Sequence, residues 1–245
     1  SIASLVTVES SVALSNIFPN VNKGNYMSTA YSLTMLSVVL DASESGDENI
    51  TKTMHLFLQR GGMKSMSTLL KHLNQPELSN APRQVKRLVL VLMSTIRRAT
   101  ALANSKMIMN QTTHTNLVVD MLRVPINMAS SSTNAMIVGG EEIVIATENA
   151  LSYFLMIAST DEIAVSLLTD AKGLRFDELL NLLLFHLGSS YNDKDNEICL
   201  NIRSLVLRAC LALCNPKRRI DGGVIQARFQ MARLLADAMD YVCDL

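Results

Sequence analysis

The placement of glycine and proline constrains the fold of this chain more than any other sequence feature. All ten glycines and five prolines fall at the edges of, or between, segments whose apolar residues repeat at helical spacing. Because both residues destabilise a helix interior, they divide the chain into helical blocks. The eleven blocks are residues 2–18, 25–40, 48–60, 63–73, 82–103, 113–124, 141–159, 161–171, 174–187, 196–215 and 224–243.

The apolar pattern within the blocks indicates helices rather than strands. In block 82–103, Val85, Leu88, Leu92 and Ile96 follow the spacing of one helix face. Hydrophobic residues make up 49 % of the chain, but aromatic residues only 4 %, and Trp is absent. This composition excludes a disordered chain and disfavours a β-sandwich, which needs many turns and favours aromatic residues. The 14 Met are expected to fill core gaps. The sequence therefore predicts an all-α protein.

One pattern recurs: a short helix, a glycine-containing break, a second helix with Leu-Leu near its end, a loop and a longer third helix. It is clearest over residues 53–73, with Gly61-Gly62, and again over residues 164–183, with Gly173. A degenerate middle copy covers residues 107–122. The third helices are predicted over 82–103, 141–159 and 196–215, and an Ala-Leu-Ser-Asn-Ile run lies at 13–17. This pattern resembles the armadillo-like superfamily of helical repeats.

The resemblance implies a right-handed superhelical stack, an α-solenoid, in which the third helices line the concave surface. Gly62 and Gly173 lie 111 residues apart, more than two repeats of about 42 residues would give, so an irregular middle repeat is expected. We expect one armadillo-like domain over residues 1–245, with a flexible Ser-rich insertion at about 129–140. The lack of an initiating Met suggests a fragment of a larger protein.

No catalytic or cofactor motif is found. The sequence contains no HExxH, Walker loop, GxGxxG or GxSxG pattern. The four histidines stand in different blocks without carboxylate or Cys at ligand spacing, so satisfied or surface roles are expected. Cys210 and Cys214 share a helix face but lack a second ligand pair, and buried thiols are the better interpretation. We predict a non-enzymatic protein without cofactor or metal.

The charges are segregated along the chain, although 22 basic and 22 acidic residues cancel overall. No acidic residue lies between Leu78 and Val119, and from Asp120 to Glu197 acidic residues outnumber basic ones by 12 to 4. On a helical wheel, the cations of block 82–103 fall within about 120°. The partner-binding residues predicted on this sector are Arg83, Lys86, Arg87, Leu90, Met93, Arg97 and Arg98. Val85, Leu88, Val89, Leu92 and Ile96 are predicted to be core.

A secondary basic patch is predicted at Arg203, Lys217, Arg218 and Arg219. The leading hypothesis is a scaffold that binds an acidic or phosphorylated protein segment on a concave basic surface; the alternative for the basic stripe is a solvated helix face. Nucleic-acid binding is a second hypothesis, disfavoured by the zero net charge and few aromatics. A third is self-association through apolar segments 12–17 and 229–242. We expect no membrane segment and a cytoplasmic or nuclear location.

Overall fold

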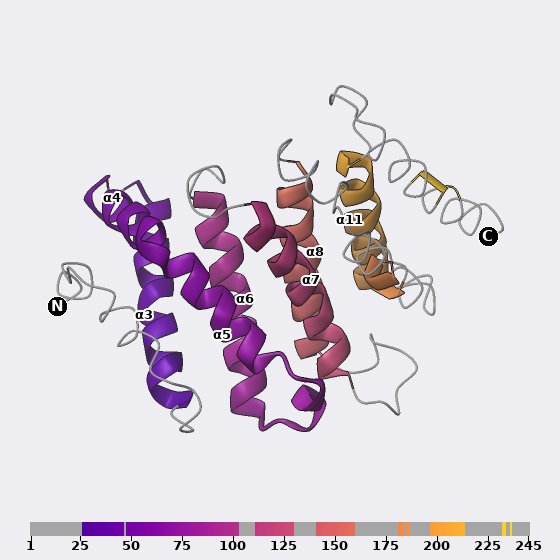
Figure 1. Ribbon diagram of the computed structural model, residues 1–245, viewed down its shortest axis with the longest axis horizontal. Coiled ribbons are helices and arrows are strands. Elements are labelled where there is room, and N and C mark those ends of the chain that lie inside the picture. Colours follow the sequence, from indigo (N-terminus) through magenta and orange to yellow (C-terminus); the bar gives the residue numbers. More distant parts are fainter. Residues whose placement is uncertain are drawn as a thin grey trace. The chain divides into compact units, whose positions relative to one another are not determined.

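A computed structural model of the chain describes residues 26–46, 48–102, 111–129, 141–159, 181–183, 185–186 and 197–213, with positions 232, 233 and 236 (Figure 1). These residues are helical apart from short turns and connections, and no strand occurs among them. The prediction of an all-α protein is therefore confirmed. Contacts divide the chain into two compact units, Ser1–Asn110 and Gln111–Leu245. The expectation of one domain stays a prediction, and each unit is described by itself.

The described part of unit 1 contains four α-helices and two short irregular turns of helix. They are α3 (Tyr26–Glu44), α4 (Glu48–Phe57), the π-helical turn η2 (Leu58–Gly62), α5 (Met63–Leu73), the 3₁₀ turn η3 (Pro76–Asn80) and α6 (Arg83–Leu102). Helix α6 packs against α3 and against α5, while α3 also packs against α4 (Figure 1). The ends of α5 and α6 agree with the predicted blocks to within one residue.

The core of unit 1 is aliphatic and rich in methionine. Met54, Met63, Met66 and Met93 are at most 1 % exposed, and they lie among Leu and Val side chains of the same helices. Unbranched thioether side chains fill irregular gaps between helix layers. The predicted core residues of α6, which are Val85, Leu88, Val89, Leu92 and Ile96, are all buried. The interpretation of methionine as core is confirmed for these residues.

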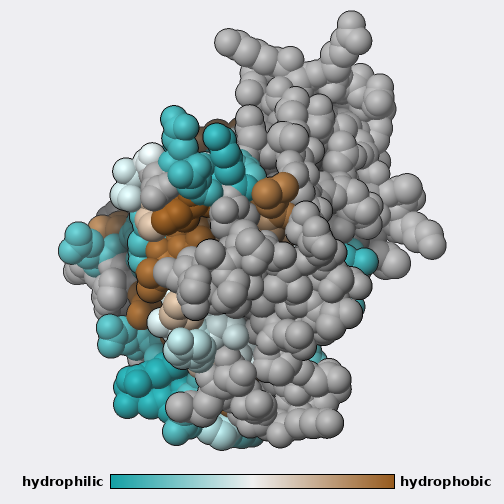
Figure 2. Space-filling view, turned by 90° about the vertical axis from the view of Figure 1, so that its left-hand side faces the viewer, coloured by the Kyte–Doolittle hydropathy of each residue, from teal (hydrophilic) through white to brown (hydrophobic). Residues whose placement is uncertain are grey.

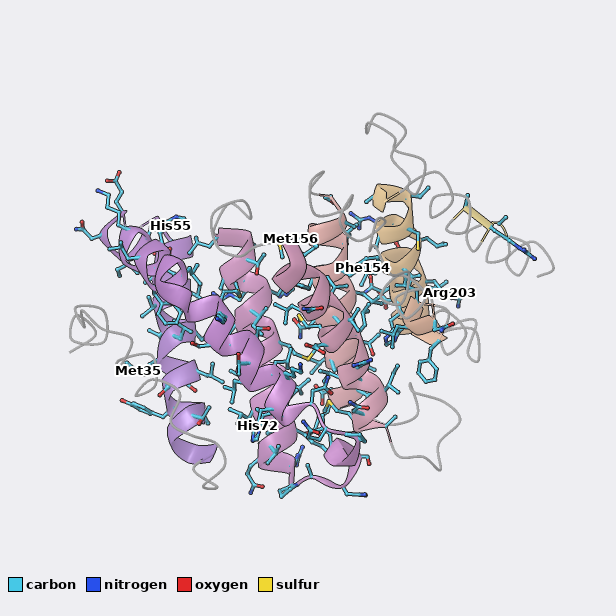
Figure 3. The ribbon with its side chains drawn as sticks, in the orientation of Figure 1. Met35, His55, His72, Phe154, Met156 and Arg203 are labelled. Carbon is cyan, nitrogen blue, oxygen red and sulfur yellow. The ribbon has the colours of Figure 1, made fainter. Side chains whose placement is uncertain are left out.

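Unit 2 contains α7 (Gln111–Met128), α8 (Glu141–Ala158) and α11 (Glu197–Leu213). Helix α8 packs against α7 and against α11, and its Tyr153 and Phe154 are fully buried. Phe154 lies on the side of α8 nearer α11 (Figure 3). Two glutamates occupy the first turn of α8, where the helix dipole favours negative charge.

One expected proline position is wrong. Pro125 was expected at a segment edge after residue 124, but α7 continues to Met128 and contains it. Proline removes one backbone N–H from the helix ladder. Its ring is buried, and the backbone N–H of Ala129 returns to the Pro125 carbonyl at 3.0 Å. The helix thus continues past Pro125 although the proline lacks an N–H to donate. This part of the helix is buried at Val124, Pro125 and Met128.

The expected break at Gly61-Gly62 is confirmed and has a clear physical cause. Gly61 has φ of +99°, a left-handed conformation that side-chain-bearing residues rarely adopt. A Cβ atom at Gly62 would lie 2.4 Å from the Phe57 ring. The turn that separates α4 from α5 therefore depends on glycine at both positions, for two different reasons.

We predict that Gly62→Ala lowers the free energy of unfolding by about 1–3 kcal/mol, the usual cost of overpacking. The added methyl group must displace the Phe57 ring. In a Phe57→Leu background the same substitution should cost less, because the smaller side chain leaves room. Denaturant unfolding of the four proteins in this double-mutant cycle measures the difference, and an equal cost in both backgrounds would contradict the explanation.

Candidate functional site

Helix α6 separates its buried apolar side from an accessible basic side. We define the α6 basic face as the accessible residues Arg83, Lys86, Arg87, Leu90, Ser94, Arg97 and Arg98. Arg83 and Arg87 are exposed, and the other five residues are half-buried. The opposite side carries the core side chains that pack against α3 and α5. The sequence thus correctly located the cations on the side of α6 away from its core.

The expectation for Met93 is wrong. It was predicted as an apolar anchor on the basic sector, but its side chain is 0 % exposed. At 100° per residue, Met93 falls about 20° beyond Lys86 and beside Val89 and Thr100, which belong to the core. Sequence reasoning instead missed Val91, which is 40 % exposed and borders the basic face on its other edge. On a helical wheel, Val91 lies between Arg87 and Gln84, which are both exposed. This position could have predicted its exposure.

Arg98 is held by α3 at one edge of the α6 basic face. Its Nη1 donates to Ser37 Oγ at 3.1 Å, and its Nη2 forms an ion pair with the Asp41 carboxylate. The Arg98 side chain is 19 % exposed and that of Asp41 65 %. This arginine therefore ties α3 to α6, and its carboxylate ligand comes from the solvent-facing side of the neighbouring helix.

Lys86 is held at the other edge. Its Nζ donates to the backbone carbonyl of Ser79 at 2.6 Å, which secures the end of η3 against the first turns of α6. Among the described residues, no salt bridge involves Arg87 or Arg97, and the buried Nε of Arg97 lacks a hydrogen-bond partner there. The cations thus differ in role: Lys86 and Arg98 contact their own unit, whereas Arg87 and Arg97 keep their charges available.

Apolar surface in unit 1 lies mainly away from this face. Tyr31 and Val38 on α3 and Leu56 on α4 are each more than two-fifths exposed. Figure 2 shows apolar atoms bordered by hydrophilic ones on the side of the molecule where α3 and α4 lie. The accessible side of α6 is therefore distinguished by charge, with Leu90 and Val91 as its local apolar residues.

The predicted secondary basic patch is not a surface feature at its only described member. Arg203 was expected to be accessible, but it is 7 % exposed within α11. It follows the buried Ile202 on the helix, with Val206 one turn further on, and therefore lies on the packed side of α11. Lys217, Arg218 and Arg219 lie outside the described residues, as do segment 12–17, residues 130–140 of the predicted insertion and segment 229–242 apart from positions 232, 233 and 236.

The described histidines do not form a common site within their units. His55 lies on α4 and His72 near the end of α5 (Figure 3). No group of three or more His, Cys, Asp or Glu side chains among the described residues is arranged to hold a metal ion. Cys210 is buried, as expected for a small apolar side chain, and Cys214 lies outside the described residues. None of the described helices is both long and apolar enough to cross a membrane.

His186 in unit 2 is deeply buried, unlike His55 and His72. Its Nε2 lies 2.9 Å from the Leu122 carbonyl of α7, so this nitrogen must carry the proton and donate. Burial lowers the pKa of His186 from its usual 6.5 to about 4, although the hydrogen bond to Leu122 acts in the opposite direction. The neutral ring is a core histidine as expected, but it is satisfied at Nε2 only, because its buried Nδ1 has no hydrogen-bond partner among the described residues.

The comparisons with known proteins do not extend this description. No protein-family model matches the chain, and no curated protein or solved structure matches it either.

His186 predicts a specific loss of stability in acid. Since its pKa is lower in the folded state, the unfolded chain binds the proton first as the pH falls below about 6.5. The stability contribution is complete above that pH, falls between about 6.5 and 4, and changes no further below. The loss reaches about 3 kcal/mol.

The control is His186→Gln, whose amide can donate to Leu122 but does not titrate. Denaturant unfolding of both proteins at several pH values between 4 and 7.5 measures the difference between their free energies of unfolding. The difference should shift in favour of the variant as the pH falls. Two curves that remain parallel would show that His186 is not the responsible group.

Proposed function

We propose that this chain is a non-enzymatic protein-interaction scaffold that binds a partner segment on the α6 basic face. The observation that carries the proposal is the division of α6 into a packed apolar side and an accessible side with five cations and no carboxylate of its own. An ordinary solvated helix face mixes both charge signs, whereas a one-sided charge distribution favours a partner of the opposite sign.

The distribution of charge within unit 1 supports an acidic partner. The described residues of unit 1 include nine Lys or Arg but four Asp or Glu. Asp41, one of these four, already pairs with Arg98. Five of the nine cations lie on α6, and the other four are matched in number by the acidic residues. The net positive charge of the described part of unit 1 is therefore concentrated on α6, where it would steer an acidic segment towards the α6 basic face.

The armadillo-like arrangement belongs to the same proposal. Three observations support it: the Gly61 break between α4 and α5, the longer α6 that follows η3, and the packing of α6 on α5. Short helix, turn, second helix and longer third helix thus occur in the predicted order in unit 1. In a right-handed superhelical stack of such units, α6 would belong to the concave surface. We propose a cytoplasmic or nuclear protein that needs no cofactor for this role.

Reversing two charges tests the proposed surface. We expect Arg87→Glu/Arg97→Glu to lose the partner proteins that the unchanged chain captures from a nuclease-treated cell extract, because the face then repels acidic segments. The matched control is Lys64→Glu/Lys71→Glu, which makes the same change in net charge at two exposed positions of α5. Mass spectrometry of the captured proteins, beside circular dichroism and thermal unfolding of each variant, provides the measurement.

The same experiment separates the alternatives. The proposal requires that the control variant keeps the partners that the α6 variant loses, while both stay folded. Identical captured proteins for all three forms would refute the α6 basic face as the binding surface. Partners that the unchanged chain captures from an untreated extract but not from the nuclease-treated one would instead favour nucleic-acid binding.

A further inference from the structure

The accessible residues of α6 follow a spacing that constrains the shape of a partner. Residues at alternating intervals of four and three positions form one seam along the helix. They are Arg83, Arg87, Leu90, Ser94, Arg97 and Ala101, and all six are exposed or half-buried. We call them the α6 seam. A seam with this repeat matches the accessible stripe that one helix presents to another.

Charge and size vary along the α6 seam in a definite order. Arg83 and Arg87 lie at its beginning, Leu90 and Ser94 occupy its middle, and Arg97 and Ala101 follow. Arg87 and Arg97 are ten residues apart, which corresponds to about 15 Å along the helix axis. Small residues at 94 and 101 leave room for a neighbouring helix to approach closely.

The two cations on the flanks of the seam already have protein ligands. Lys86 is held by the Ser79 carbonyl and Arg98 by Ser37 and Asp41, and neither belongs to the four–three repeat. These contacts fix the flanks of the seam against η3 and α3. A partner would therefore meet its main attraction at Arg87 and Arg97, on either side of Leu90.

Arg98 also shows which anion this surface accepts. Its ligand Asp41 is a carboxylate on the exposed side of a packed helix, with a side chain that is 65 % exposed. The same geometry, a helix-borne carboxylate that reaches an α6 arginine from a neighbouring helix, would serve Arg87 and Arg97. Carboxylate–guanidinium pairs are directional and stronger than neutral hydrogen bonds.

We infer that the partner is an acidic amphipathic helix, with two carboxylates about three turns apart on either side of aliphatic residues. In a helix, residues i, i+4, i+7 and i+11 lie within about 60° of one another. Acidic residues at i and i+11 and aliphatic residues at i+4 and i+7 thus match the order of charge and apolar surface along the α6 seam. This inference rests on the proposed function and specifies the partner's chemistry and form.

Two synthetic helical peptides of identical composition test the spacing. The in-phase peptide carries Glu at i and i+11 and Leu at i+4 and i+7. Its isomer exchanges the second Glu with the Ala at i+9, which turns that carboxylate to the opposite side of the helix. Circular dichroism checks that both have equal helix content. Titration calorimetry against the complete chain should show that the in-phase peptide binds about tenfold tighter or better.

A charge swap tests the contacts themselves. The Arg87→Glu/Arg97→Glu variant should bind the in-phase peptide about tenfold more weakly than the unchanged chain does. It should instead bind a version of this peptide that carries Lys at i and i+11. The Lys64→Glu/Lys71→Glu variant should behave like the unchanged chain towards both peptides. This exchange of preference does not arise from misfolding, because a misfolded variant would lose both peptides.

The outcomes distinguish this inference from the proposed function. Equal affinity for the two isomers, lost in the α6 variant, overturns the helical spacing but keeps the basic face as an acidic-segment site. Affinity that the α6 variant retains overturns both. If binding requires phosphoserine in place of the two glutamates, the carboxylate assignment is wrong and the partner's anion is a phosphate.

Discussion

The packing of α6 between α3 and α5 is the constraint on which the rest of unit 1 depends. Burial of Leu88, Leu92 and Ile96 removes a broad apolar stripe from water. Burial of this stripe fixes the rotation of α6 about its own axis. It therefore also fixes the direction in which the remaining residues of α6 point. The orientation of Arg87 and Arg97 towards solvent is thus a consequence of core packing. Lys86 and Arg98 then anchor the two flanks through Ser79 and Asp41.

Features that depend on local periodicity could be predicted closely from sequence. The α5 boundaries and the start of α8 at Glu141 agree with the predicted blocks, because glycine, proline and acidic residues act within one or two turns. Pro125 shows the limit of this reasoning. A proline ends a helix when nothing compensates for its missing N–H. In α7 the residues around Pro125 are buried, and the helix continues to Met128.

The candidate site was predictable as a face but not in its details. A wheel assigns each residue an angle, and burial then depends on how far the neighbouring helices reach around α6. Met93 lies only about 20° outside the basic sector, which suffices for complete burial. The contact of Arg98 with Asp41 joins residues 57 positions apart, and no local pattern encodes that distance. Arg203 likewise could be placed on a helix but not on its buried side.

Two of the five cations on α6 are bound within unit 1, and this reduces the charge repulsion along the α6 basic face. Guanidinium groups repel one another, but Arg98 is neutralised from α3, and Lys86 is bound to a carbonyl dipole. The repulsion that remains falls mainly on Arg87 and Arg97, which lie about 15 Å apart along the helix and are screened by solvent. Such an arrangement keeps the unbound chain stable while leaving charges that an approaching acidic helix would neutralise. Stability of the free unit and attraction for the proposed partner are therefore compatible, because different cations of α6 would serve each purpose.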